Sequence, residues 1–532
     1  MVPEFILPWI LNLSMWIPLM GSLFLFLCGS PKRGRIMAVL FSTLSLVFTV
    51  VLTLQFMTNY AASVQFDSVG SALSESIRLG YVVGLDGASI LLFAMTSFIG
   101  WVAILTAPKV FARTNNAFYG LLLILLGASL GVFAAQDLFL FYVFFELALI
   151  PMAFLLGIWG EEERTSATYT FVIYTLVGSL LMLVGVLTIG FTAASLMEGV
   201  SFTTHFDDLM AAAHLFQELP FWVFGSFLFA FAIKIPLFPF HSWQANAYAQ
   251  APIPAVLFMA PIMVKFGSYA LVRFVIPYFP VLFAQVTPWI ATLAVISILY
   301  GAMIAITATD IKKILAFSSL SHMGFIVLGL AAWNETAIQG AMLQMVNHGL
   351  TTAALFLGFG YVLVSNPSRN LMDHGGIASD RPVLTTMIVI ASMASVGLPG
   401  LNGFVGEFMI LSGAFDSSHL GTTLYAVLAA IAVILAAMYT LRLLKFTLFG
   451  TPNQTPSEPT GQTSDQLLDQ ADAHSAAQQP KGWVLSLFVL LMIWIGFQSP
   501  TFTSFSKNWT SSIVEHIEQI GSFEPDFEPD NE

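Results

Sequence analysis

Residues 227–241 read FLFAFAIKIPLFPFH, an apolar stretch that carries one lysine, Lys234, and two prolines, Pro236 and Pro239. A charge at mid-bilayer costs at least about 2.5–3.5 kcal/mol on insertion scales, so it indicates a function by default. Each proline removes a backbone N–H and frees a carbonyl of the preceding turn. Non-helical backbone at membrane depth is tolerated only inside protein or beside water. The stretch therefore predicts a transmembrane helix that is broken next to a buried charge.

The rest of the chain has the composition of a helical membrane protein. Of its 532 residues 57% are hydrophobic and 9% are charged, whereas ordinary soluble domains carry roughly 25% charged residues. The net charge of −12 and the absence of a basic patch exclude a nucleic-acid binder. The apolar stretches are continuous rather than alternating, which excludes an outer-membrane barrel. The single cysteine, Cys28, allows neither an intrachain disulfide nor a cysteine-based cluster.

Membrane spans can be placed because each needs about 20 mainly apolar residues. We expect an all-α polytopic membrane protein with about 14 transmembrane helices. The fourteen segments are 6–28, 37–58, 83–106, 117–135, 138–159, 168–193, 220–240, 254–279, 285–307, 312–333, 338–365, 384–414, 421–449 and 482–499. The polar stretch 450–481 is expected to be a flexible linker, and 503–532 an acidic tail with a short helix over 513–520.

The distribution of basic residues predicts the orientation. Of eighteen Lys and Arg residues, Arg78 and Lys507 fall in even-numbered loops or the tail, and Lys234, Lys265 and Arg273 fall within spans. The thirteen others fall in odd-numbered loops: Lys32, Arg33, Arg35, Lys109, Arg113, Arg164, Lys312, Lys313, Arg369, Arg381, Arg442, Lys445 and Lys481. By the positive-inside rule the odd loops are cytoplasmic, and both termini lie on the opposite side.

Among the charged residues inside the predicted spans four stand out, namely Glu146, Lys234, Lys265 and Glu407. Two carboxylates and two amines form a neutral set, so pairing would offset part of their desolvation. One interpretation is a structural Glu–Lys pair that holds helices together. The other is a proton site, because burial disfavours the charged form of a lysine and a nearby glutamate restores it. A moving carboxylate could then control the proton on the lysine.

Two spans also carry polar faces with a histidine. Imidazole titrates near neutral pH and passes a proton between its two nitrogens, so we interpret His322 and His348 as proton carriers rather than packing residues. Metal binding is the weaker alternative, since no HxxxH or HxxE pair occurs in any span. Helical spacing places on shared faces Ser318, Ser321 and His322 in one span and Gln344, Asn347, His348, Thr351 and Thr352 in the next.

A second span is interrupted as well, by Gly397, Pro399, Gly400 and Gly403 just before Glu407. Spans four to eight and nine to thirteen are five apart, an odd shift that inverts topology, so broken helices 7 and 12 correspond. This layout predicts two inverted five-helix repeats; two unrelated proline kinks are the alternative. The predicted units are residues 1–116 (helices 1–3), 117–280 (first repeat), 281–449 (second repeat), 450–481 (linker) and 482–532 (helix 14 and tail).

Several segments together resemble the antiporter-like membrane subunits of respiratory complex I, and within them the chain M (subunit 4) branch. The resemblance covers roughly residues 80–450 and rests on an ordered set of motifs. They are FFELALIPM from residue 144, FAIKIPLFPFHSW from 231, the Lys265 segment ending YALVRF, TDIKKILAFSSLSHMGF from 309, QMVNHGL from 344 and GLPGLNGFVGEFMIL from 397.

This resemblance implies roles for the buried residues. Glu146 and Lys234 would be the coupled carboxylate–lysine pair and Lys265 the central relay lysine. His322 and His348 would lie on the central axis, and Glu407 would be the carboxylate of the second half-channel. The implied function is proton translocation in the membrane arm of an NADH- or ferredoxin-driven quinone oxidoreductase. Alternatives are a chain of a multi-subunit cation/proton antiporter or membrane-bound hydrogenase, and a non-transporting membrane scaffold.

The same resemblance implies the setting. No cofactor is expected in this chain; NAD(H) or ferredoxin, FMN, iron–sulfur clusters and quinone would belong to partner subunits, and antiporter-like chains would be neighbours in the bilayer. The membrane would be the bacterial inner membrane, with the thylakoid as the alternative. One segment departs from the family pattern His-x-Trp-Leu-Pro-Asp-Ala-His: Gln244, Ala245, Asn246 and Tyr248 replace Leu, Pro, Asp and His. The segment thereby loses a charge and a titratable ring.

Overall fold

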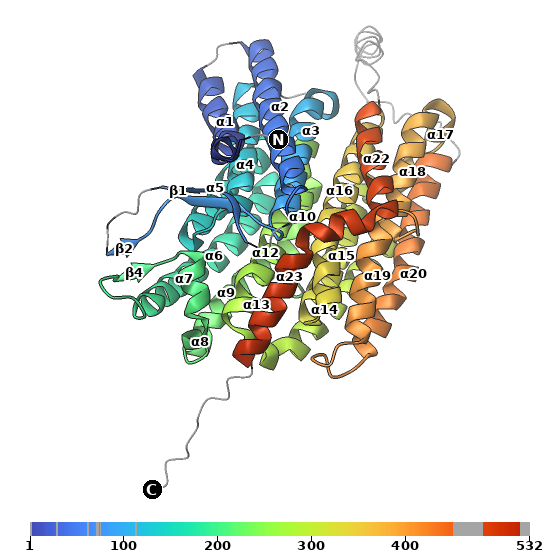
Figure 1. Ribbon diagram of the computed structural model, residues 1–532. Helices are drawn as coiled ribbons and strands as arrows, with labels where there is room; N and C mark the ends of the chain where they lie inside the picture. Colours follow the sequence, from blue (N-terminus) through green and yellow to red (C-terminus); the bar gives the residue numbers. More distant parts are fainter. Residues whose placement is uncertain are drawn as a thin grey trace.

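The computed structural model describes residues 3–27, 30–60, 63–70, 74, 76–111, 114–450 and 482–521, and these form a bundle of helices (Figure 1). Within these ranges eleven helices are long and apolar enough to cross a membrane, or twelve if one bent pair is a single span. The polytopic helical prediction is confirmed, whereas the count of fourteen stays a prediction. The unbroken helices are α1 (Leu7–Leu27), α2 (Pro31–Phe56), α3 (Ile90–Val110), α4 (Asn116–Ala134), α5 (Leu138–Trp159), α6 (Arg164–Ala194), α14 (Pro280–Thr307), α15 (Ile311–Ala331), α16 (Glu335–Ser365) and α20 (Leu424–Leu444), which continues into η5 (Lys445–Phe449).

Both predicted helix breaks are present. α9 (Phe221–Lys234) ends at the lysine itself, and α10 (Ser242–Gln250) follows after a turn. α18 (Pro382–Val396) and α19 (Asn402–Phe415) flank the second break. Gly397 and Gly400 have φ values of +83° and +90° there, which side chains other than glycine rarely adopt. The two breaks therefore arise from different chemistry, proline in the first and glycine in the second.

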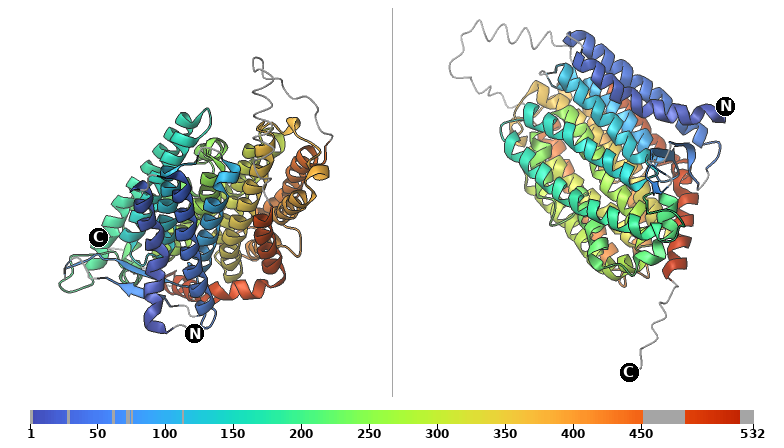
Figure 2. Two further views of the ribbon diagram at one scale, coloured as in Figure 1. Left: turned by 90° about the horizontal axis from the view of Figure 1, so that it is seen from above. Right: turned by 90° about the vertical axis from the view of Figure 1, so that its left-hand side faces the viewer.

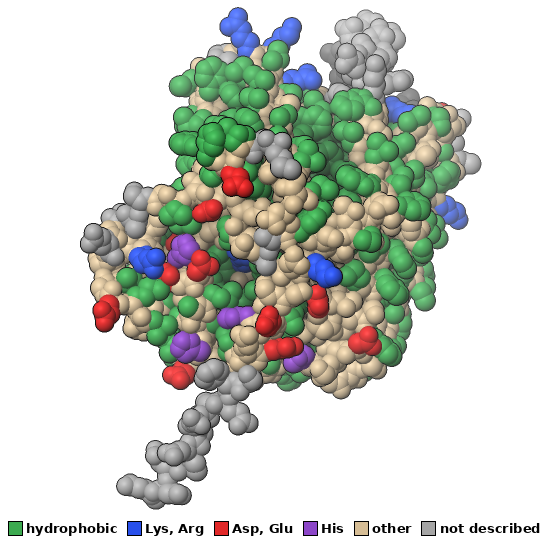
Figure 3. Space-filling view, in the orientation of Figure 1, with side chains coloured by type: hydrophobic (Ala, Val, Ile, Leu, Met, Phe, Trp, Pro, Cys, Tyr) green, Lys and Arg blue, Asp and Glu red, His purple; other side chains and the backbone are tan. Residues whose placement is uncertain are grey.

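The centre of the bundle is a composite helix over residues 253–278, buried along its whole length. It consists of α11 (Ile253–Phe258), η2 (Met259–Met263), α12 (Val264–Ala270), η3 (Leu271–Val275) and α13 (Ile276–Tyr278), and η2 and η3 are π-helical. Large apolar side chains on the outside of the bundle are exposed, for example Leu180 and Val184 on α6. Figure 3 shows hydrophobic side chains over α1 and α2 and charged side chains gathered around α23. This arrangement suits a lipid-facing surface with a polar end.

Short strands, which the all-helical prediction did not include, lie in two of the long connections. β1 (Gln65–Val69) pairs antiparallel with β3 (Val82–Leu85), and β2 (Ile77–Arg78) pairs parallel with β4 (Phe202–Thr203). Because each strand has five residues or fewer, none gave a periodic signal. The remaining short helices are η1 (Glu4–Ile6), α7 (Phe206–Ala211), α8 (Ala213–Phe216), η4 (Leu371–Asp373) and α17 (Ile377–Asp380).

The C-terminal region contains more helix than expected. α22 (Trp483–Phe497) is followed at 72° by α23 (Ser499–Gly521), a 23-residue helix in place of the short one predicted over 513–520. α23 crosses helix ends: Phe505 stacks on Phe56 of α2 at 5.8 Å between ring centroids, and Ser511 Oγ donates to Glu335 Oε1 of α16 at 2.7 Å. Figure 2 shows α23 along the end of the bundle that carries the strands. The linker residues 451–481 and the acidic residues 522–532 lie outside the described residues.

Candidate functional site

The first helix break is held by hydrogen bonds from neighbouring elements. Trp243 Nε1 of α10 donates to the carbonyl oxygen of Ile233 at 3.0 Å, which satisfies a carbonyl in the last turn of α9. The N–H of Phe238 donates to Ser297 Oγ of α14 at 2.9 Å. These bonds fix the end of α9, and so they fix Lys234, the last residue of that helix.

Lys234 is 2% exposed, and its Nζ has no hydrogen-bond partner among the described residues. The ammonium instead lies over the Phe145 ring, 4.4 Å from its centroid, and 5.9 Å from the centroid of Phe266. Glu146 acts on Lys234 electrostatically, but the two form no ion pair within 4.0 Å in the described part of the chain. In this conformation the predicted Glu146–Lys234 pair is therefore separated, and cation–π contacts take its place.

α5 carries Glu146 and begins at a buried cap. Asp137 Oδ1 accepts from the N–H of Leu140 at 2.9 Å, and its Oδ2 accepts from Thr204 Oγ1 at 2.7 Å. Burial raises the pKa of the Asp137 carboxyl above its ordinary value. The cap thereby ties the start of α5 to the segment that follows β4.

Lys265 lies on α12, between the two π-helical turns, and is fully buried. π-Helical turns inside α-helices are frequent at functional sites because they change which residues share a face. The Lys265 Nζ hydrogen-bonds His348 Nδ1 of α16 and donates to the carbonyl oxygen of Ala260 at 3.3 Å. The predicted central lysine and one predicted central histidine are thus in direct contact.

His322 connects this pair to Glu407. The His322 ring lies 5.6 Å from the His348 ring between centroids. Its Nδ1 lies 2.9 Å from Glu407 Oε1, and its Nε2 lies 3.2 Å from Ser395 Oγ of α18. Gln344 Nε2 of α16 also donates to Glu407 Oε1, at 3.1 Å. The structure thus brings together four of the six predicted residues, which we name the central relay: Lys265, His348, His322 and Glu407.

Lys234 and Glu146 lie outside this chain of contacts. The Phe266 ring is beside the Lys234 ammonium, and among the described residues Glu146 is the charged group that acts on Lys234. Within the central relay the Nε2 of His348 is buried without a hydrogen-bond partner in the described residues. No hydrogen bond joins Lys234 to Lys265, or His348 Nε2 to His322, among the described residues, so a water would be needed to connect them.

The sequence interpretation missed a buried ion pair near the strands. Arg273 of η3 bonds Asp86 through an ion pair and donates to Gln136 Oε1 at 2.9 Å. Its guanidinium also lies 5.1 Å from the Phe206 ring centroid and 5.7 Å from that of Trp509 on α23. The arginine inside a predicted span was the available signal, but nothing in the spacing pointed to its partner 187 residues earlier.

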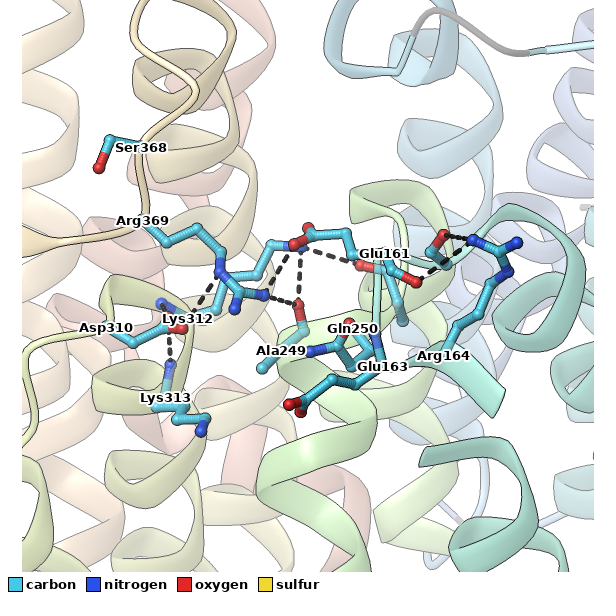
Figure 4. A network of polar contacts seen from close by, with 12 residues as sticks. Glu161, Glu163, Arg164, Ala249, Gln250, Asp310, Lys312, Lys313, Ser368 and Arg369 are labelled. Atoms are coloured by element: carbon cyan, nitrogen blue, oxygen red, sulfur yellow. Dashed lines mark hydrogen bonds and ion pairs between the residues drawn. The ribbon is translucent and has the colours of Figure 1, made fainter. Parts of the chain in front are cut away.

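A second missed group, shown in Figure 4, joins three parts of the chain, and we name it the Glu161 cluster (Glu161, Asp310, Lys312 and Arg369). Glu161 accepts from Lys312 Nζ at 2.5 Å and from Arg369 at 2.7 Å, and Arg369 Nε lies 3.1 Å from Asp310 Oδ2. Lys312, counted in the sequence as a loop charge, belongs to the first turn of α15 and its side chain is 4% exposed. The cluster links the loop after α5, the start of α15 and the loop after α16.

Among the residues with described positions, no group of three or more His, Cys, Asp or Glu side chains could hold a metal ion. The family described as NADH:quinone oxidoreductase/Mrp antiporter, TM matches residues 135–435, a range that contains all six predicted site residues. The chain belongs to this family.

Relatives of this NADH:quinone oxidoreductase/Mrp antiporter chain match it over most of their length. It is 33% identical over 452 residues to NADH-quinone oxidoreductase subunit M of Rickettsia felis, covering 83% of this chain and 88% of the relative. It is 32% identical over 514 residues to NADH-ubiquinone oxidoreductase chain 4 of Marchantia polymorpha, covering 96% and 98%. A chain of respiratory complex I from Thermus thermophilus with bound NADH aligns with a TM-score of 0.78 at 32% identity, covering 95% of this chain and 99% of that chain.

Proposed function

We propose that the chain is a proton-translocating membrane-arm subunit of an NADH-quinone oxidoreductase. The observation that carries the proposal is the central relay, four titratable side chains inside a membrane-spanning bundle that are joined by hydrogen bonds except between the two neighbouring histidine rings. Electron transfer, with its flavin, iron–sulfur clusters and quinone, belongs to partner subunits. This chain therefore couples that electron transfer to proton movement and carries out no redox step itself. Its partners are neighbouring antiporter-like chains, and its membrane is the bacterial inner membrane, with both termini on the non-cytoplasmic side.

The contacts support a stepwise mechanism. When Glu146 approaches Lys234 it stabilises the charged amine, and when it withdraws the lysine can release its proton through water toward Lys265. Lys265 gives a proton to His348 Nδ1, and His348 releases one from Nε2 toward His322. His322 then delivers a proton from Nδ1 to Glu407 Oε1. Lys265 belongs to the proposed first repeat (117–280) and the three acceptors to the second (281–449), so the central relay crosses from one repeat to the other.

The alternative is a chain of a multi-subunit cation/proton antiporter or membrane-bound hydrogenase, because the family description names both complex I and Mrp antiporters. Purification of the native complex separates these functions. Flavin- and iron–sulfur-bearing partner chains support the oxidoreductase, whereas a set of small membrane chains without redox groups overturns it. Proton uptake into sealed vesicles during quinone reduction, measured with and without a sodium ionophore, identifies the transported ion.

A further inference from the structure

A polar seam runs along α15 from the Glu161 cluster toward the central relay. Residues 312, 316, 319 and 322 are spaced by four, three and three, so they share one broad face of the helix. α10 packs against this face. At the cluster end, Lys312 Nζ donates to the carbonyl oxygens of Ala249 and Ala251 at 3.2 and 3.0 Å. Further in, Gln244 Nε2 donates to the carbonyl oxygen of Ala316 at 3.3 Å.

Two hydroxyl groups lie unpaired in the middle of the seam. Tyr248 is fully buried and Ser319 is 1% exposed, and neither hydroxyl has a hydrogen-bond partner among the described residues. Gln244 and Ser319 act on the Tyr248 hydroxyl, although neither makes a hydrogen bond to it. An unsatisfied buried hydroxyl is destabilising, and a water with several polar partners removes that cost. The site therefore has the chemistry of a buried water site.

This pair of hydroxyls lies between the Glu161 cluster and the two central histidines. Ser319 is one helical turn from His322 on α15. The Tyr248 ring touches Phe356 of α16, at 6.0 Å between centroids, and Phe356 is two turns from His348 on the same face. His348 Nε2, the unpaired nitrogen of the central relay, is also buried without a hydrogen-bond partner among the described residues.

The outer end of the seam is held together by the ion pairs of the Glu161 cluster, and one residue of that cluster is exposed to solvent. The Glu161 side chain is 40% exposed, whereas Lys312, to which it is bonded, is 4% exposed. Glu161 thus connects solvent to the first buried group of the seam. Its bonds to Lys312 and Arg369 hold the loop after α5 against α15 and the loop after α16, as Figure 4 shows.

We propose that this seam is a proton-uptake route to the central relay, separate from the one that serves Lys234. Glu161 takes up protons at the solvent end of the seam, and its bonds within the Glu161 cluster close that end. Tyr248 and Ser319 hold the water that carries the proton to His348 and His322. Each hydroxyl gives its proton to the next acceptor as it takes one from the water before it, so neither changes charge. The inference rests on the proposed function. It also gives Gln244 and Tyr248, which depart from the family pattern, a role that needs no titratable side chain.

The first test measures proton uptake and quinone reduction together in sealed membranes that hold the native complex. The double variant Tyr248→Phe, Ser319→Ala should transfer about tenfold fewer protons per quinone reduced, because a positioned proton carrier contributes at least that factor to the rate of proton transfer. Ser319→Thr, which keeps a hydroxyl, should retain transfer. The matched controls Tyr119→Phe and Ser129→Ala remove buried, unpaired hydroxyls from α4 and should leave transfer unchanged.

The outcomes separate this inference from the proposed function. Wild-type transfer in the double variant, together with loss of transfer in His348→Ala, overturns the seam and leaves the proposed function standing. Wild-type transfer in both overturns the proposed function itself.

A second measurement remains informative if the double variant fails to assemble. In a Cys28→Ser background, Ser319→Cys is exposed to a small cationic thiosulfonate during turnover, and labelling of this chain is read by mass spectrometry. Ser319→Cys should be labelled, and faster when Glu161→Gln removes the charge that closes the solvent end of the seam. Ser129→Cys should stay unlabelled. Equal labelling rates at the two positions, in both backgrounds, would overturn the route.

Discussion

The Nδ1 nitrogen of His322 lies 2.9 Å from the Oε1 oxygen of Glu407, and each of these two residues is 5% exposed. A carboxyl group this deeply buried is stable only with hydrogen-bond partners, and Gln344 supplies another. The contact joins α15, an unbroken helix, to α19, which begins immediately after the second helix break. In the proposed mechanism, this one hydrogen bond carries a proton from the central histidines to α19, the helix that starts at the second break.

Replacement of Glu407 distinguishes proton transfer from a structural charge. Glu407→Gln keeps the volume and can still hydrogen-bond His322 and Gln344, but it cannot take up a proton, so we expect proton transfer to stop. Glu407→Lys puts another titratable group in the same place and should retain part of the transfer. The measurement is proton uptake into vesicles alongside quinone reduction, with the exposed Glu515→Gln as the control. Full transfer in Glu407→Gln with none in Glu407→Lys would favour a structural role.

Lys234 should be required for pumping but not for assembly. Lys234→Ala removes the amine and leaves the hydrogen bonds that hold the break, Trp243 to Ile233 and Phe238 to Ser297, in place. Lys234→Arg should fail as well, because arginine does not release its proton in a protein. The ratio of protons pumped to electrons transferred checks both variants, and Lys507→Ala on the exposed side of α23 is the control. An assembled Lys234→Ala complex with the wild-type ratio would exclude the lysine from the route.

Glu146→Gln should strongly reduce proton pumping, for a reason different from that of the Lys234 variants. Glu146 is the charged group among the described residues that acts on Lys234, and without its charge the ammonium keeps its contacts with the Phe145 and Phe266 rings. The lysine then loses the switch between holding and releasing its proton, so we expect pumping to fall to a small fraction of wild type. Initial rates of proton uptake measure the effect. Glu146→Asp, which keeps the charge on a shorter side chain, should retain more activity than Glu146→Gln, and the reverse order would contradict the switch.

The parts of the site that sequence could predict are those encoded in one helix. Charge burial pointed to Lys265 and Glu407, helical spacing placed His322 and His348 on polar faces, and Pro236 and Gly397 marked the breaks. The structure brings four of these residues into contact, although no spacing rule states which helix faces which. Glu146 and Lys234 were expected to pair, yet here the ammonium lies on Phe145.

What sequence could not predict depends on contacts between distant segments. Arg273 and Asp86 are 187 positions apart, and Glu161 and Arg369 are 208 positions apart. Tyr248 looked like the loss of a titratable group, because its burial beside Ser319 is a property of the packed helices. α23 was underestimated since its apolar residues occupy only one face, and an amphipathic helix at the end of a bundle resembles a polar tail in a hydropathy profile.

Topology can be tested by labelling from either side of sealed vesicles. The basic residues of the odd-numbered loops predict that the linker 450–481 lies on the cytoplasmic side and residues 503–532 on the other. Single cysteines introduced into each segment of a Cys28→Ser chain should react with an impermeant reagent from opposite sides. Detergent-opened vesicles, in which both segments should react, are the control. Reaction of both from one side would mean an even number of spans between them and would rule out the count of fourteen.

The ion pair between Arg273 and Asp86 should stabilise the fold by charge compensation and should take no part in proton transfer. Arg273 is 8% exposed and Asp86 1% exposed, and Gln136 and the Phe206 and Trp509 rings complete the site around the arginine. Removing one partner of a buried ion pair leaves the other charge uncompensated, which typically costs about 3–5 kcal/mol. Asp86→Ala should therefore lower the amount of assembled complex and the temperature at which quinone reduction is lost. The double variant Asp86→Leu, Arg273→Met removes both charges, so it should recover most of that loss and pump at the wild-type ratio. If the double variant assembles at the wild-type level but does not pump, the pair takes part in proton transfer. The position of Arg273 two helical turns from Lys265, on the same composite helix, would then explain that role.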